Sequence, residues 1–379
     1  MNKKERYDIR RFGAKLGLFL LLFSPLVGFG YICLYMSGEL DSFPSYIHPL
    51  RQDQLFGLAY SNYDKAYKFH MTEEVFRPQV LALGSSRIMQ VKHTVINPDY
   101  SFYNAGGAIQ TLRELPLFLN KLHDSPELII VNIDQWWFNR AKIDADQNYS
   151  PSVYDVPELS FLKTGRLVCD FYTDLVKGKI HLSKVFGSYH IGLNAICNED
   201  GFSADGSRHS SIGVIKPENQ YDYNFKNVLA RIRNGNNCFQ YGDQADSSQV
   251  NALEDFLSKC VARQIKVVAF LPPFAPFVYK RMQETGKYGY MSQIYMMLQP
   301  VFRRYEGCSL YDFTDVTDTG AHNYDFEDGF HGTEIIYNRI LRKIAAQDSI
   351  LASYLVSEQE MDKLDSVYLS KNIRYHSIQ

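Results

Sequence analysis

Residues 80–87 read VLALGSSR, and this stretch decides the fold class that the sequence predicts. Its apolar run, 80–83, is typical of a strand buried on both faces, and the glycine that follows allows a tight turn. Short apolar runs of the same kind recur at wide intervals along the chain, at 102–103, 128–131, 267–271 and 310–311. The sequence therefore predicts several buried strands.

Helical patterns lie between these runs. Apolar residues recur every three or four positions in 111–122, 249–263 and 335–346. Strands that alternate with helices indicate an α/β fold, with a parallel sheet covered by helices on both faces in three α/β/α layers. We expect this domain to span 78–347, with a polar insertion rich in Tyr, Asn and Gly at about 140–248 and a C-terminal extension at 348–379.

The first 36 residues predict a membrane anchor. Residues 1–15 are basic, and residues 16–36 contain no charged residue. This uncharged stretch has about the length that a helix needs to cross a bilayer. The apolar run is longer than that of a usual cleaved signal peptide and lacks an A-x-A-like exit; a buried core helix is the other alternative. Basic residues favour the cytoplasm, so we expect an extracytoplasmic domain after a stalk and lead-in segment at 37–77.

Composition excludes some functions. The chain has 379 residues and a formal net charge of −2, which does not favour binding to nucleic acid. Its six cysteines show no spacing typical of a metal site, and we predict no metal and no cofactor. Outside the cytoplasm, Cys197 and Cys238 are candidates for a disulfide. The aromatic content of 14% suits either sugar and partner binding or an ordinary core.

Three polar segments follow strands or precede a helix, and parallel strands bring such segments to one edge of the sheet. Ser86 is a candidate nucleophile at a strand end or a plain helix cap. The segment Asn104-Ala105-Gly106-Gly107 permits close backbone approach to a ligand or forms a simple turn. In Asp328-Gly329-Phe330-His331, Asp328 is placed to orient His331 as a general base. The alternative is that Asp328 is a surface residue and His331 caps the helix that follows.

In this order, these segments resemble the SGNH (GDSL-like) hydrolase superfamily over roughly 78–345. The N-terminal anchor and Leu271-Pro272-Pro273 are similar to its cell-envelope branch, which includes the alginate and peptidoglycan O-acetylation proteins and DltD, the teichoic-acid D-alanylation protein. The resemblance implies a flavodoxin-like parallel sheet with Ser86 as nucleophile and Asp328 and His331 as acid and base. It also implies that the N–H of Gly106 or Gly107, in the segment that starts at Asn104, binds the oxyanion.

Two blocks depart from the family pattern. The glycine place counted from Asn104 holds Ile109, and the third block reads Asn132-Ile133-Asp134-Gln135-Trp136-Trp137 where the family has Gly-x-Asn-Asp. Asp134 thus replaces an amide that donates to the oxyanion, and an ionised carboxylate cannot donate. Gln135 has the required chemistry one residue later. A missing donor costs about 10²–10³ in rate. Trp136 and Trp137 would stack on a sugar ring or pack under the insertion.

The resemblance implies an acyl-handling serine enzyme, an acetylesterase or O-acyltransferase that acts on a cell-envelope polysaccharide beside a membrane-bound O-acyltransferase (MBOAT) partner. The altered third block favours a different class, a non-catalytic subunit that binds the glycan for such a partner. A soluble lipase is disfavoured because the G-x-S-x-G motif is absent before Ser86.

Overall fold

The computed structural model describes residues 3–146, 154, 161–210 and 222–371. The chain divides into two compact units. The first consists of 1–46, 54–62 and 157–201, and the second of 47–53, 63–156 and 202–379. The insertion expected at about 140–248 therefore contributes to both units.

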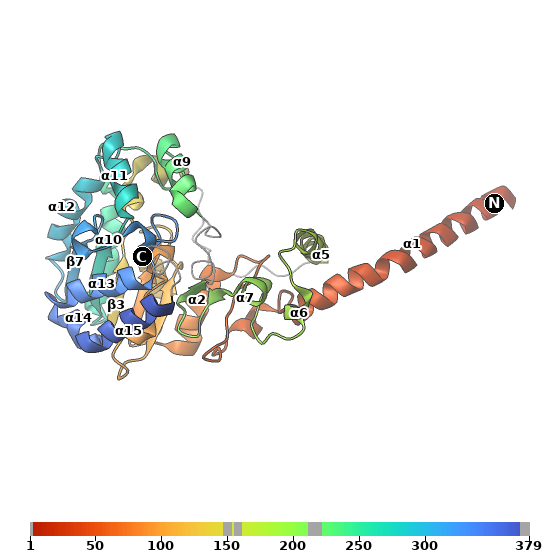
Figure 1. The fold of residues 1–379 in the computed structure, drawn as a ribbon, viewed down its shortest axis with the longest axis horizontal. Helices are drawn as coiled ribbons and strands as arrows, with labels where there is room; N and C mark the ends of the chain where they lie inside the picture. Colours follow the sequence, from red (N-terminus) through yellow and green to blue (C-terminus); the bar gives the residue numbers. More distant parts are fainter. Residues whose placement is uncertain (1–2, 147–153, 155–160, 211–221, 372–379) are drawn as a thin grey trace. The chain divides into compact units, whose positions relative to one another are not determined.

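A five-stranded, all-parallel sheet forms the centre of the second unit (Figure 1). Its order is β2-β1-β3-β6-β7. The strands are β1 (Val80–Gly84), β2 (Phe102–Gly106), β3 (Leu128–Asn132), β6 (Lys266–Leu271) and β7 (Cys308–Asp312). All five residues of β1, β2 and β3 are buried, so these strands are covered on both faces. The α/β class and the parallel sheet predicted from the apolar runs are confirmed.

Helices follow the strands at the predicted places. The three expected helical patterns correspond to α3 (Glu114–Lys121), α10 (Val250–Ala262) and α13 (Glu334–Ala345). Among the described residues, this unit also contains the helices α2 (Asp64–His70), α4 (Arg140–Ala145), α9 (Lys226–Asn234), α11 (Pro276–Thr285), α12 (Met291–Phe302), α14 (Ser349–Tyr354) and α15 (Glu358–Lys371). Short 3-10 turns follow β1 and β3, namely η3 (Ser86–Ile88) and η5 (Gln135–Phe138). The chain also contains the short strands β4 (Asp200–Phe202) and β5 (Arg208–Ser210).

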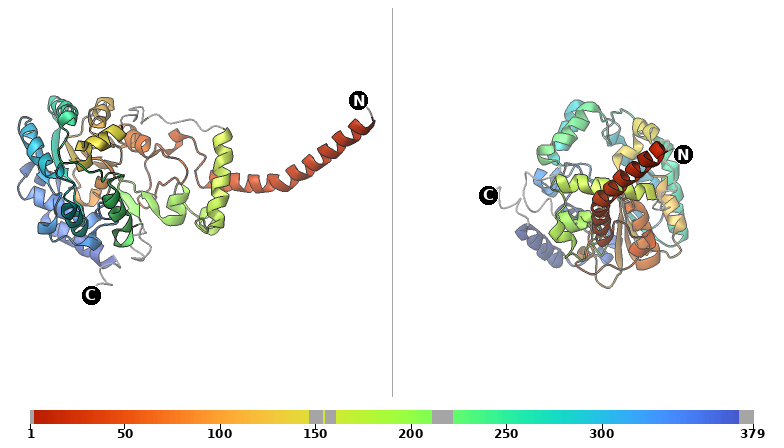
Figure 2. Two further views of the ribbon diagram at one scale, coloured as in Figure 1. Left: turned by 90° about the horizontal axis from the view of Figure 1, so that it is seen from above. Right: turned by 90° about the vertical axis from the view of Figure 1, so that its right-hand side faces the viewer.

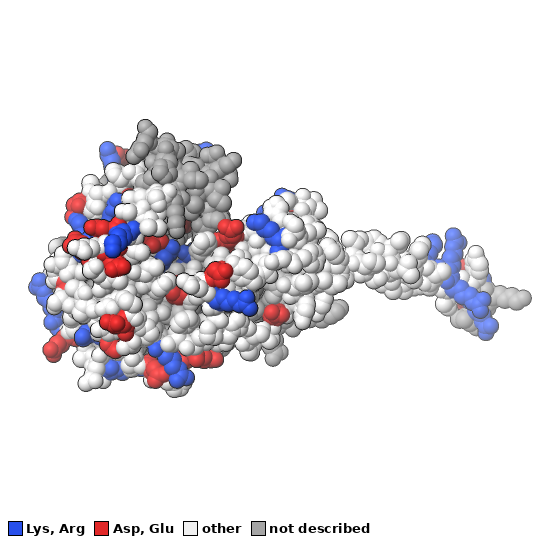
Figure 3. All heavy atoms as spheres, turned by 60° about the horizontal axis from the view of Figure 1, so that its bottom comes forward, with Lys and Arg blue, Asp and Glu red and all other residues white. Residues whose placement is uncertain are grey.

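The first unit is built on one long N-terminal helix, α1 (Lys3–Met36), with α5 (Phe161–Val176), α6 (Leu182–Val185) and α7 (Leu193–Asn198) around its C-terminal end. Helix α1 is long and apolar enough to cross a membrane, a test that a signal sequence also passes. Figure 3 shows basic side chains at its N-terminal end and an uncharged surface beyond them.

The six cysteines are all free thiols, so the candidate bridge between Cys197 and Cys238 is not formed. The core of the first unit takes up two of them, since Cys33 and Cys197 pack in one apolar cluster with residues of α5, α6 and α7. Burial also raises the pKa of the Cys238 thiol to about 11, so that it is protonated at neutral pH.

Candidate active site

Ser86 lies at the carboxyl end of β1, as the first residue of η3. The hydroxyl of Ser85 begins the turn by accepting a hydrogen bond from the Arg87 N–H at 3.2 Å. Gly84 permits the bend, because its φ is +149° and a Cβ there would lie 1.9 Å from the side-chain oxygen of Asn132. Ser86 is exposed although its neighbours on both sides are buried. The turn thus presents one hydroxyl at the edge of the sheet.

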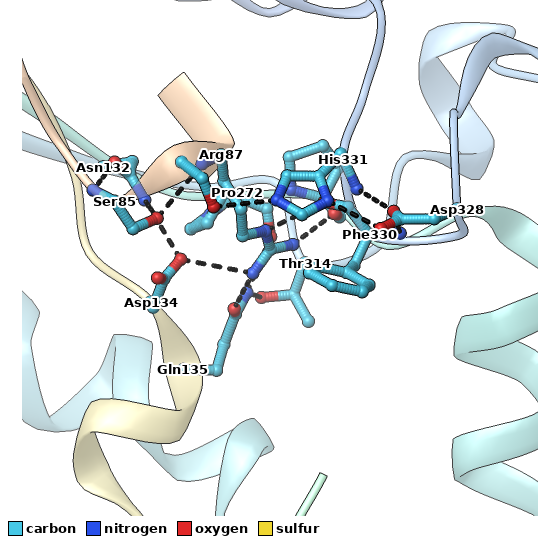
Figure 4. A network of polar contacts seen from close by, with 12 residues as sticks. Ser85, Arg87, Asn132, Asp134, Gln135, Pro272, Thr314, Asp328, Phe330 and His331 are labelled. Carbon is cyan, nitrogen blue, oxygen red and sulfur yellow. Dashed lines mark hydrogen bonds and ion pairs between the residues drawn. The ribbon is translucent and has the colours of Figure 1, made fainter. Parts of the chain in front are cut away.

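His331 and Asp328 reach this hydroxyl from a loop 245 residues away in sequence (Figure 4). The Ser86 Oγ lies 2.8 Å from His331 Nε2, and His331 Nδ1 lies 2.8 Å from Asp328 Oδ2. The other carboxylate oxygen of Asp328 accepts the His331 N–H at 2.9 Å. With Asp328 on Nδ1, the tautomer that leaves Nε2 free to accept the serine proton is favoured. The structure brings the three predicted residues together.

The loop that carries Asp328 is fixed by its own backbone. Gly329 has a φ of +93°, and its carbonyl accepts the Ala275 N–H at 2.8 Å. Burial alone would raise the pKa of the Asp328 carboxyl. The charge of His331 and the hydrogen bonds from His331 and Phe330 outweigh burial, so the pKa lies below its ordinary value. The lowered pKa favours the ionised carboxylate of Asp328, which is the form that accepts a hydrogen bond from His331 Nδ1.

The N–H groups predicted to bind an oxyanion are occupied. Gly106 N–H donates to the Asn104 side chain at 2.7 Å, and Gly107 N–H donates to the Gly84 carbonyl at 2.9 Å. Ile109 N–H donates to the same carbonyl at 3.1 Å. Both N–H groups thus have partners inside the protein in this structure, and their binding to an oxyanion stays a prediction. Among the described residues, no acceptor faces the N–H of Ser86 itself, which leaves this group for an oxyanion.

Asn104 supports the turn that carries Ser86. Its side chain is fully buried, and its Nδ2 donates to the carbonyls of Ile88 and Val91 at 2.9 and 2.7 Å. These carbonyls belong to the turn after β1, so Asn104 joins β2 to that turn. Both of its amide hydrogens are used inside the protein, and its contact with substrate stays a prediction.

Gln135 does not face the candidate oxyanion position either. Its Nε2 donates to the Pro272 carbonyl at 2.7 Å and to Thr314 Oγ1 at 2.8 Å, and its Oε1 accepts from Arg87 at 2.8 Å. The side chain is fully buried. Both amide hydrogens of Gln135 are bonded inside the protein in this structure, and its role as a substitute donor stays a prediction.

Arg87 is the centre of this buried network, and the sequence analysis assigned it no role (Figure 4). Its Nε donates to the Phe330 carbonyl at 3.0 Å, its Nη1 lies 3.4 Å from Asp134, and its Nη2 donates to the Pro273 carbonyl. The guanidinium also lies over the ring of Trp136, 4.9 Å from its centre. Arg87 thus joins the loops that follow β1, β3 and β6 to the loop that carries His331.

Asp134 and Arg87 form a buried ion pair with no exposed side-chain surface. Burial raises the pKa of Asp134 and lowers that of Arg87, although each partner opposes the shift of the other. Asn132, whose role the sequence analysis also missed, donates to Asp134 and to Ser85 Oγ at 3.0 Å and accepts the Ser85 N–H at 3.0 Å. The sequence shows Asn132 as a polar residue at the end of a buried strand, but it does not show which residues its side chain contacts.

The two tryptophans border a pocket of about 270 Å³ with largely apolar walls. Trp136 is buried and meets Phe330 edge-on at 5.9 Å, so it packs against the histidine loop as well as lining the pocket. Trp137 is buried too, and its indole N–H has no partner among the described residues. The pocket is lined by Thr111, Leu112, Arg113, Glu114, Leu117, Trp136, Trp137, Lys142, Ile143, Asp146 and Gln249.

Within the described ranges, no group of three or more His, Cys, Asp or Glu residues is placed to hold a metal ion. In comparisons with known proteins, the chain matches no family model, and no curated protein matches it at a significant level. The geometry of the site is therefore the basis for assigning its chemistry.

Proposed function

We propose that this protein is an extracytoplasmic serine acyl esterase or transferase that handles acetyl (acyl) groups on a cell-envelope polysaccharide. The carrying observation is the array of Ser86, His331 and Asp328, joined by two contacts of 2.8 Å. An exposed serine hydroxyl within hydrogen-bond reach of an imidazole that is itself held by a buried carboxylate is the arrangement required for acyl transfer. The acetyl group and the glycan come from the resemblance to the envelope branch of the SGNH superfamily.

In the proposed reaction, Ser86 Oγ attacks the acyl carbonyl carbon while its proton moves to His331 Nε2. The Ser86 N–H stabilises the resulting oxyanion. The tetrahedral intermediate collapses, the proton on Nε2 passes to the leaving alcohol oxygen, and an acyl ester remains on Ser86. A sugar hydroxyl or water then attacks this ester and gives its proton to Nε2, which returns it to Ser86. Asp328 stabilises the imidazolium in both steps.

The test uses the purified full chain with 4-nitrophenyl acetate and a fluorophosphonate probe. We expect Ser86→Ala to abolish both turnover and labelling, and His331→Ala to abolish labelling because the hydroxyl is then not activated. Ser101→Ala serves as a matched control and should behave like the unaltered protein. Unchanged acetate release by the Ser86→Ala variant would refute the mechanism.

A second candidate function is a glycan-binding accessory subunit with weak or no catalysis. It is favoured by the occupied N–H groups of Gly106 and Gly107 and by the buried side chains of Asp134 and Gln135. Absence of labelling at Ser86 in the intact protein, together with saturable binding of O-acetylated polysaccharide, would support this alternative over the enzyme.

The strand order supports the SGNH assignment. Numbered within the sheet alone, it is 2-1-3-4-5, the order of flavodoxin-like folds, which place ligands beyond the carboxyl ends of the strands. The burial of Ser86's neighbours at that edge agrees with a three-layer α/β/α domain of this type.

The packing around α1 supports a retained anchor over a cleaved signal sequence. Cys33 and Leu34 are fully buried in the core of the first unit. Just beyond the helix, the Glu39 carboxylate accepts the N–H groups of Ala59 and Leu193 at 2.8 Å. Cleavage near the end of α1 would remove part of this core. We therefore propose a single-pass membrane protein with a cytoplasmic N-terminus, which works beside an MBOAT-like partner.

A further inference from the structure

Helix α5 lies across the C-terminal part of α1 (Figure 2). A Cβ at Gly30 of α1 would touch the ring of Tyr172 at 3.0 Å and Val168 at 3.1 Å. The Tyr172 hydroxyl donates to the carbonyl of Leu26, one turn further back along α1. These contacts place α5 against α1 at Leu26 and Gly30, before the end of the apolar stretch.

The position of these contacts decides how much of α1 is free to cross a membrane. Lys15 is the last charged residue before the apolar stretch, and Leu26 lies 11 residues after it. At about 1.5 Å per residue this distance is about 16 Å, roughly half of the ~30 Å hydrocarbon core. Measured from Arg11 instead, it is only about 22 Å. Tilting the helix shortens its length along the bilayer normal further. The part of α1 that precedes the contact with Tyr172 is therefore too short to cross the whole hydrocarbon core.

A second contact agrees with this depth. The ring of Phe186, next to the end of α6, lies 6.5 Å from that of Phe29, centre to centre. Phe29 is 14 residues beyond Lys15, or about 21 Å along the helix. The side chains of Phe186 and Phe29 remain 48% and 37% exposed, and they continue the apolar surface of α1 at Leu26, which is 51% exposed.

We infer that Tyr172 and Phe186 form a membrane-embedded face, inserted into the outer leaflet of the lipid bilayer around α1. The inference rests on the proposed anchoring by α1 and is independent of the chemistry at Ser86. Lipid is the occupant because the face is continuous with the surface of α1 that already faces lipid. The Tyr172 hydroxyl is bonded to a helix carbonyl and the Phe186 side chain is apolar, so neither side chain brings an unpaired polar group into the hydrocarbon region. The first unit thus holds the anchor at a fixed depth.

The test uses the full chain with Phe186→Trp in liposomes whose acyl chains carry bromine, a short-range quencher of Trp fluorescence. The sequence has two tryptophans, both buried in the other unit, and their signal is subtracted using the unaltered protein. Met296→Trp on α12, at a side chain that is 70% exposed, is the reference for an exposed tryptophan on the α/β unit. We expect the added fluorescence of Phe186→Trp to be quenched at least twofold more than that of Met296→Trp.

Equal quenching of the two variants would overturn the inference. If Phe186→Trp does not fold like the unaltered protein by circular dichroism, Tyr172→Trp tests the same face with the same expected result. A face that a partner protein covers would show no extra quenching in liposomes of pure lipid, which also overturns the inference. Failure of the unaltered chain to float with the liposomes would instead refute the anchoring, so the two failures are distinguishable.

Discussion

Replacement of Arg87 is the perturbation for which the structure gives the clearest magnitude. Arg87→Met keeps an unbranched side chain of similar length but leaves Asp134 as a buried carboxylate without its cation. Breaking a buried ion pair in this way costs about 3–5 kcal/mol. The carbonyls of Phe330 and Pro273 also lose their donor, at roughly 1 kcal/mol each. We therefore expect Arg87→Met to lower the free energy of unfolding by at least about 5 kcal/mol.

A double-mutant cycle with Asp134→Asn separates the ion pair from the other contacts. Arg87→Met/Asp134→Asn no longer buries a lone charge, so its cost should fall short of the sum of the two single changes by about 1–3 kcal/mol. Urea unfolding followed by tryptophan fluorescence measures this directly, because Trp136 lies against the guanidinium and Trp137 follows it. Additive costs, or a loss below about 1 kcal/mol for Arg87→Met, would refute the reasoning.

Three further predictions concern the same unit. Asp328→Asn should slow acetate release and phosphonate labelling by about 10⁴-fold, since the histidine tautomer is no longer fixed; an effect below tenfold would contradict the assigned role. Gly84→Ala should cost several kcal/mol of stability in thermal unfolding, whereas Gly286→Ala, also at positive φ but with open space around it, should cost about 1 kcal/mol; equal costs would show that the contact with Asn132 is unimportant. Burial lowers the pKa of Lys68 to about 7. Above that pH the unfolded chain binds a proton that the native chain lacks, so the free energy of unfolding should rise towards pH 10 by up to about 1.4 kcal/mol per pH unit. Lys68→Met should abolish this rise, and parallel pH profiles of the two proteins would disprove the assignment.

The strands and main helices could be predicted because their signals are local. The apolar run at 80–83 and the helical period in 249–263 depend only on neighbouring residues, and both predictions hold to within one or two residues. The grouping of 157–201 with α1 could not be predicted, because it depends on contacts such as that of Val168 with Gly30, far apart in sequence.

Within the site, the sequence was informative about groups whose spacing determines their geometry. Asp328 and His331 are three residues apart on one loop, a separation short enough for their side chains to meet. The partners of the predicted oxyanion donors could not be read from the sequence, because a backbone N–H or an amide side chain has several competing acceptors and only the tertiary structure decides among them. Arg87 was overlooked for the same reason: a basic residue after an exposed serine reads as a surface charge until its partners are known.

The occupied N–H of Gly107 does not by itself decide against catalysis, because the magnitudes favour its release. Its hydrogen bond to the Gly84 carbonyl contributes about 0.5–1.5 kcal/mol net, whereas a second oxyanion donor stabilises a transition state by about 2.7–4 kcal/mol. A substrate that displaces this bond would therefore gain more in the transition state than it loses on binding. While the Gly107 N–H leaves the Gly84 carbonyl, the loops that carry Ser86 and His331 must keep their positions. These loops are joined by Arg87, Asn104 and Asn132. If the proposed enzyme function holds, the buried polar network would keep Ser86 and His331 in place while the Gly107 N–H changes its acceptor.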